Sequence, residues 1–111
     1  MITMTFVREK TRLGKLMVPI LAIDRYSDTN FEILNESYRT YAEIIRFLYL
    51  KQPNVFGNLC KYELREIKER KRNTKESPSE TAMEQSLMAY KNAIVHAIER
   101  TLDYIADYIE S

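Results

Sequence analysis

The sequence contains little glycine and little proline, with two and three residues respectively among 111. Both shares are well below the usual values of about 7% and 5%. All-β folds use many glycines in tight turns, and phosphate-binding loops use several glycines close together. The scarcity of both residues therefore argues against these structures and favours a helical protein.

Cysteine and histidine occur once each, as Cys60 and His96, and tryptophan does not occur. One cysteine cannot form a disulfide within the chain, and this pair does not supply the ligands that a protein-bound zinc ion needs. The sequence also has no cofactor fingerprint and no nucleophile motif. We therefore expect no metal site, no cofactor and no small-molecule substrate, with Cys60 as a small core residue.

Apolar residues make up 45% of the sequence and charged residues 30%, as in ordinary globular proteins. An apolar run at residues 16–23 follows basic residues, but it is shorter than the roughly 20 residues of a membrane span. It also lacks the cleavage site of a signal peptide. We expect a single domain over residues 1–111 that is cytoplasmic and does not enter a membrane.

Residues 29–52 show the clearest helical periodicity. Their apolar residues recur three and four positions apart, which places them on one face of a helix. Thr29 and Glu32 fit a capping box at the start, and Pro53 marks the end. This predicted stripe comprises Phe31, Leu34, Tyr38, Tyr41, Ile45 and Leu48.

A second, longer helix is predicted from Ser79 to about Ile109, with Ser77 as its cap and Pro78 at its first position. Such a helix would be roughly 45 Å long. A compact chain of this size is only about 35 Å across. Either the helix breaks, or the bundle is elongated, or a second chain covers the overhanging end.

Two further helices are less sharply defined. One is predicted at about residues 58–72, and residues 1–26 fit either one helix kinked near Pro19 or two short helices. Connections are expected at residues 24–30, 52–57 and 73–77. Together these elements predict an all-α fold, an antiparallel bundle of about four helices with a long C-terminal helix.

The end of the last helix is the first candidate interaction surface. Asp103 and Asp107 oppose the helix dipole there, and Tyr104 and Tyr108 are suited to an interface rim. We therefore predict a protein that is not an enzyme, forms a dimer or larger homo-oligomer, and binds a protein partner. The predicted interface comprises Leu102, Asp103, Tyr104, Ile105, Asp107, Tyr108 and Ile109.

The charge distribution suggests an alternative function. Residues 1–75 contain 15 Lys or Arg and 9 Asp or Glu, whereas residues 76–111 contain 2 and 7. The basic segment 61–75 would meet nucleic-acid phosphates. However, Glu63, Glu66, Glu69 and Glu76 lie within it or directly after it, and a solvated helix face is the simpler interpretation. Its candidate residues are Lys61, Arg65, Lys68, Arg70, Lys71, Arg72 and Lys75.

A second alternative comes from the segment Lys91-Asn92-Ala93-Ile94-Val95-His96. It resembles the Arg-Asn-x-x-x-His motif of the HEPN family, helical domains that include many metal-independent ribonucleases. The resemblance implies a general acid or base at His96, with Lys91 in place of the family's arginine. Lysine cannot make the planar, bidentate phosphate contact of arginine.

Overall fold

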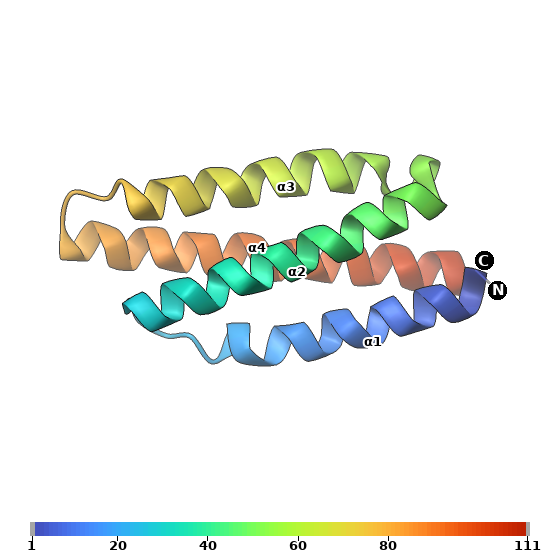
Figure 1. The fold of residues 1–111 in the computed structure, drawn as a ribbon, viewed down its shortest axis with the longest axis horizontal. Coiled ribbons are helices and arrows are strands. Elements are labelled where there is room, and N and C mark those ends of the chain that lie inside the picture. The colour runs from blue at the N-terminus through green and yellow to red at the C-terminus, as the bar shows by residue number, and fades with distance from the viewer. Residues whose placement is uncertain (1, 111) are drawn as a thin grey trace.

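The computed structural model describes residues 2–110, which form four helices joined by short links (Figure 1). No strand occurs among these residues. The predicted all-α bundle with a long C-terminal helix is therefore confirmed. The helices are α1 (Ile2–Leu21), α2 (Asp28–Lys51), α3 (Pro53–Lys75) and α4 (Glu80–Glu110).

Consecutive helices run antiparallel, so that the two ends of the chain lie side by side at one end of the bundle (Figure 1). Helix α4 packs against α1, α2 and α3, and α2 packs against both α1 and α3. The molecule measures 48 × 23 × 17 Å. Of the three alternatives for the last helix, the elongated bundle is the one observed, because α4 runs along a bundle of its own length.

The predicted apolar stripes form the core. Leu34, Tyr41 and Ile45 of α2 are fully buried, as are Leu87 and Tyr90 of α4. At the end of the bundle that holds both termini, the core is aromatic. There the ring centre of Phe6 lies 4.8 Å from that of Tyr108 and 5.8 Å from that of Phe56, which joins α1, α4 and α3.

Two hydroxyl contacts connect α2 and α4 across this core. The Tyr90 hydroxyl donates to Oδ1 of Asn35 at 2.8 Å. The Tyr41 hydroxyl lies 3.0 Å from Oγ1 of Thr101, which itself donates to the Ala97 carbonyl. Since buried polar groups need partners, these contacts favour one register of α2 against α4.

The predicted helix caps are wrong by two residues in both long helices. Helix α2 is capped by Ser27, whose hydroxyl accepts from the backbone N–H of Asn30 at 3.0 Å. At the start of α4, the Ser79 hydroxyl accepts from the backbone N–H of Ala82 at 3.2 Å. Ser77 is not the cap, because its hydroxyl donates to the Asn73 carbonyl at the end of α3.

The expected connection at residues 52–57 is also wrong. Helix α3 begins at Pro53, and Gln52 alone separates it from α2. Proline suits the first position of a helix because that position needs no backbone N–H donor. The N-terminal segment is one helix that includes Pro19, so the two-helix alternative does not hold.

Candidate functional site: a basic groove between α2 and α3

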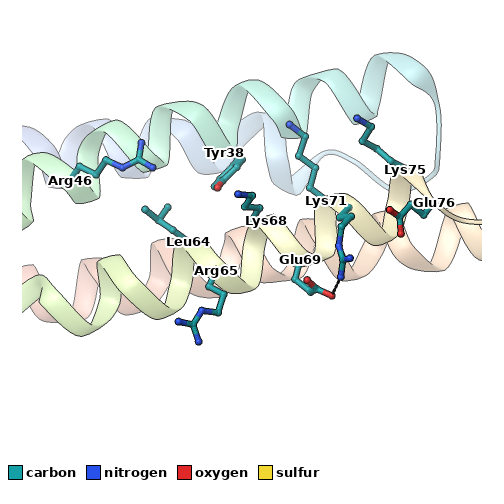
Figure 2. Close-up of a pocket in the computed structure, with 10 residues that line it drawn as sticks. Tyr38, Arg46, Leu64, Arg65, Lys68, Glu69, Lys71, Lys75 and Glu76 are labelled. Carbon is teal, nitrogen blue, oxygen red and sulfur yellow. Dashed lines mark hydrogen bonds and ion pairs between the residues drawn. The ribbon is translucent and has the colours of Figure 1, made fainter.

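A recess with a volume of about 820 Å³ lies between α2 and α3 (Figure 2). Its lining contains six cationic side chains and two carboxylates. We call it the basic groove, and its lining residues are Tyr38, Arg46, Leu64, Arg65, Lys68, Glu69, Lys71, Arg72, Lys75 and Glu76.

The groove arises where the inner face of α3 changes from apolar to basic. Leu64, Lys68, Lys71 and Lys75 are spaced four, three and four residues apart, so they share one helical face. In Figure 2 the three lysines extend from α3 toward α2. Burying an ammonium group without a charged partner costs several kcal/mol of free energy. The two helices therefore cannot close on each other beyond Leu64.

Helix α2 supplies two further residues of the groove, Tyr38 and Arg46. Tyr38 is half-buried, and Figure 2 shows it beside Lys68, with Leu64 close by. Arg46 extends from α2 on the same side as the lysines. The sequence contained no signal for either residue as a site, since they lie outside the basic segment and join it only through the packing of α2 on α3.

Two of the four glutamates that interleave with the basic segment, Glu63 and Glu66, lie on another face of α3, whereas Glu69 and Glu76 line the groove. Glu66 accepts from Arg70 at 2.9 Å, and Glu63 accepts from Arg100 of α4 at 2.6 Å. These two glutamates and their two arginine partners line a separate recess between α3 and α4. The charges that alternate along the sequence are therefore partly separated in space.

Five of the seven predicted nucleic-acid-binding residues line the basic groove: Arg65, Lys68, Lys71, Arg72 and Lys75. Arg70 does not, because it faces α4. Lys61 is also outside the lining, and its Nζ lies 5.5 Å from the ring centre of Tyr62. Within the groove, the hydrogen bond from Arg72 to Glu69 raises the pKa of the guanidinium above its ordinary value.

Tyr62 is an exposed aromatic residue next to the groove. Its ring is 55% exposed, and the guanidinium of Arg65 lies 5.9 Å from the ring centre. In Figure 2, Arg65 points away from α2. Two cations, Lys61 and Arg65, therefore lie near an exposed ring outside the groove, and exposed aromatic rings can stack on nucleobases.

The structure places two of the three motif residues of the HEPN-like segment in one recess and the third, Lys91, elsewhere. His96 is exposed and lines the recess between α3 and α4 together with Asn92. Lys91 faces the other way, and its Nζ donates to the carbonyl oxygens of Leu21 and Ile23. Lys91 therefore holds the end of α1 and the link that follows it.

The predicted interface at the end of α4 is divided between core and surface. Ile105 is fully buried, and Leu102 and Ile109 are partly buried against the core. Asp103 and Tyr104 are exposed. Tyr104, Asp107 and Tyr108 line a recess of about 340 Å³ with Val55 of α3. The apolar stripe is thus covered by its own chain, Tyr108 packs partly against the core, and Asp103, Tyr104 and Asp107 face outward.

Among the described residues, no group of three or more His, Cys, Asp or Glu is placed to hold a metal ion. Cys60 is half-buried, and burial raises the pKa of its thiol. None of the described helices is long and apolar enough to cross a membrane. No protein-family model matches the chain, and neither a curated protein nor a solved structure matches it significantly.

Proposed function

We propose that this protein acts by binding and not by catalysis, and that the basic groove binds single-stranded nucleic acid. The observation that carries the proposal is the row of cations along the inner face of α3, opposite Arg46 of α2. Within the described part of the chain, Arg46, Lys68, Lys71 and Lys75 form no ion pair. Such cations attract phosphates, because each neutralised phosphate releases counterions.

The apolar members of the groove favour a single strand over a duplex. Tyr38 and Leu64 lie among the cations, and a strand with unpaired bases can place a base against them. A duplex keeps its bases stacked inside and offers only its phosphates to a recess between two helices. Outside the groove, Tyr62 adds an exposed ring whose centre lies 5.9 Å from the guanidinium of Arg65.

Fluorescence anisotropy with a labelled single-stranded RNA or DNA of about 12 nucleotides tests this function. If Arg46, Lys68, Lys71 and Lys75 each meet one phosphate, log Kd should change with log salt with a slope of about 3. The double variant Lys68→Gln/Lys71→Gln should bind more weakly, and its slope should be smaller by about 1.4. A duplex of the same sequence should bind less tightly than the single strand.

The matched control is Lys10→Gln/Lys15→Gln, which removes the same charge from α1. This variant should retain the slope of the unmodified protein. Equal slopes for the two double variants would overturn the proposal, because binding would then depend on net charge and not on the groove. An absence of salt-dependent binding at about 50 mM salt would overturn it as well.

Self-association is the second candidate function. It is favoured by the recess at the end of α4, where Tyr104 is 42% exposed beside Val55. Light scattering should then give the mass of a dimer or larger assembly, and Tyr104→Ala/Asp107→Ala should reduce it to that of a monomer. A monomeric unmodified protein at about 100 μM would remove this candidate.

A further inference from the structure

Helix α1 carries a second apolar stripe that faces away from the bundle. Met4, Val7, Val18 and Leu21 are 70%, 48%, 70% and 56% exposed. Together they are half of the eight large apolar residues that are exposed in the described chain. Exposed apolar residues are ordinary when scattered, but their concentration on one helix indicates a contact surface.

These side chains follow the spacing of a helix–helix seam. With Thr11 and Gly14 between them, they recur at alternating intervals of three and four residues over about five turns of α1. A Cβ atom added at Gly14 would meet nothing within 4 Å apart from its chain neighbours and the backbone of its own helix. We call this set the outer stripe of α1: Met4, Val7, Thr11, Gly14, Val18 and Leu21.

The charged residues of α1 that lie beside the outer stripe are all positive. Arg8 and Lys15 lie along one side of it and Lys10 along the other, as their positions on the helix require. Glu9 is the only carboxylate of α1, and it is 4% exposed and bound to Arg12 at 3.0 Å. A partner lying on the stripe would therefore meet cations on both sides and no carboxylate of α1.

A second copy of the chain does not match this surface. Two α1 helices packed through their outer stripes would bring their own cations together, which is unfavourable. The outward residues of α4 carry the opposite charge, for example Glu99 and Asp103, but Tyr104 is the only large apolar side chain exposed on the described part of α4. A second copy thus offers an apolar stripe or acidic charge, and not both on one helix.

We infer that the outer stripe of α1 binds an amphipathic helix of another protein, with apolar residues at heptad spacing and carboxylates on either side. The apolar residues of that helix cover Met4, Val7, Val18 and Leu21. Its carboxylates pair with Arg8, Lys10 and Lys15. This site is separate from the basic groove, which lies between α2 and α3, so the chain joins an anionic strand and an acidic helix.

Two synthetic helical peptides test the inference. Each has about 18 residues, which match the length of the stripe at 1.5 Å per residue, and leucine at every heptad a and d position. One carries glutamate at the flanking positions and the other carries lysine. Fluorescence anisotropy should show that the glutamate peptide binds at least about tenfold more tightly. Equal affinities, or no binding of the glutamate peptide, would overturn the inference.

Surface variants locate the bound peptide. Val7→Gln/Val18→Gln should weaken binding of the glutamate peptide by about tenfold. Leu50→Gln is the matched control, since Leu50 is 76% exposed on α2, and it should have no effect. Because the replaced side chains are exposed, these variants should keep the circular dichroism spectrum of the unmodified protein.

Two further measurements exclude other occupants. If Lys68→Gln/Lys71→Gln weakens the glutamate peptide as much as Val7→Gln/Val18→Gln does, the peptide occupies the basic groove and the inference is wrong. If light scattering shows a dimer that Val7→Gln/Val18→Gln converts to a monomer, a second copy occupies the outer stripe, and the inference is again wrong. We expect Lys68→Gln/Lys71→Gln to bind the glutamate peptide as tightly as the unmodified protein does. We expect Val7→Gln/Val18→Gln to have the same mass in solution as the unmodified protein.

Discussion

The hydroxyl of Tyr90 on α4 donates a hydrogen bond of 2.8 Å to the side-chain oxygen of Asn35 on α2. Asn35 is 5% exposed, and its amide nitrogen donates to Glu32. Tyr90 thus supplies a hydrogen-bond donor to the side-chain oxygen of Asn35, which has little access to water. This contact and the Tyr41–Thr101 contact make α2 and α4 the central pair of the bundle, with α1 and α3 on either side.

Removing the two tyrosine hydroxyls should have unequal effects on stability. Tyr90→Phe leaves the Asn35 oxygen without its partner and should cost about 2 kcal/mol of unfolding free energy. Tyr41→Phe should cost only about 1 kcal/mol, because the Thr101 hydroxyl still donates to the Ala97 carbonyl. Urea denaturation of both variants measures the difference. Equal losses of unfolding free energy would show that the Tyr90–Asn35 hydrogen bond contributes no more than the Tyr41–Thr101 contact.

Stability should fall at alkaline pH. Burial raises the pKa values of Tyr41 and Tyr90 above 10.0, so both stay protonated in the fold where an unfolded chain would ionise them. A folded state that binds more protons loses stability as the pH rises above the unfolded pKa of about 10. The loss should be on the order of 1 kcal/mol per tyrosine at pH 11. Urea denaturation at pH 8 and pH 11 measures it.

The variant Tyr41→Phe/Tyr90→Phe serves as the control for this pH effect. It lacks both buried phenols, so the difference between its free energies of unfolding at pH 8 and pH 11 should be smaller than in the unmodified protein. If the two proteins lose the same free energy over this interval, other groups cause the alkaline loss.

Replacing Lys71 with leucine should stabilise the fold and weaken nucleic-acid binding. Lys71 is half-buried and lies seven residues after Leu64 on the face of α3 that meets α2. An apolar residue there would cover the groove and gain about 1 kcal/mol from buried area. Lys61→Leu, at an exposed position outside the groove, should leave stability unchanged. Thermal unfolding tests both, and a destabilised Lys71→Leu variant would show that lysine does not keep the helices apart.

Lys91 should contribute to stability through its contacts with the link after α1. Its ammonium group donates to the carbonyls of Leu21 and Ile23, and Lys91→Met leaves both without this donor. We expect a loss of about 1–2 kcal/mol in urea denaturation. His96→Ala, at an exposed position on the same helix, should cost less than about 0.5 kcal/mol. A larger effect at His96 than at Lys91 would contradict this assignment.

The helices of this fold were predictable where one face is apolar throughout. In the stripe from Phe31 to Leu48, four of the six residues are fully buried, because their spacing matches the turn of a helix. The large, fully buried residues of α4 show the same spacing: Leu87, Tyr90, Ile94, Ile98 and Ile105. The caps were less predictable, since Ser27 and Thr29, or Ser77 and Ser79, are equally able to accept a backbone N–H. The choice between them depends on where the chain turns, which is a property of the packed helices.

The candidate site was only partly predictable for a similar reason. Five of its cations come from the basic segment 61–75, but Tyr38 and Arg46 join them only because α2 packs beside α3. The sequence also shows glutamates among the cations, whereas Glu63 and Glu66 face α4. Sequence spacing shows which charges share one face of a helix, but which neighbouring helix packs against that face is not read from the order along the chain.

The most direct test of the account is a map of amide chemical shifts during titration with a single-stranded oligonucleotide at low salt. The proposed function predicts the largest shifts at the basic groove, around Arg46, Leu64, Lys68 and Lys71, and small shifts in α1 and on the α4 side of the bundle. Shifts concentrated around Asn92 and His96, in the recess between α3 and α4, would contradict it, and so would shifts spread evenly over all the basic residues.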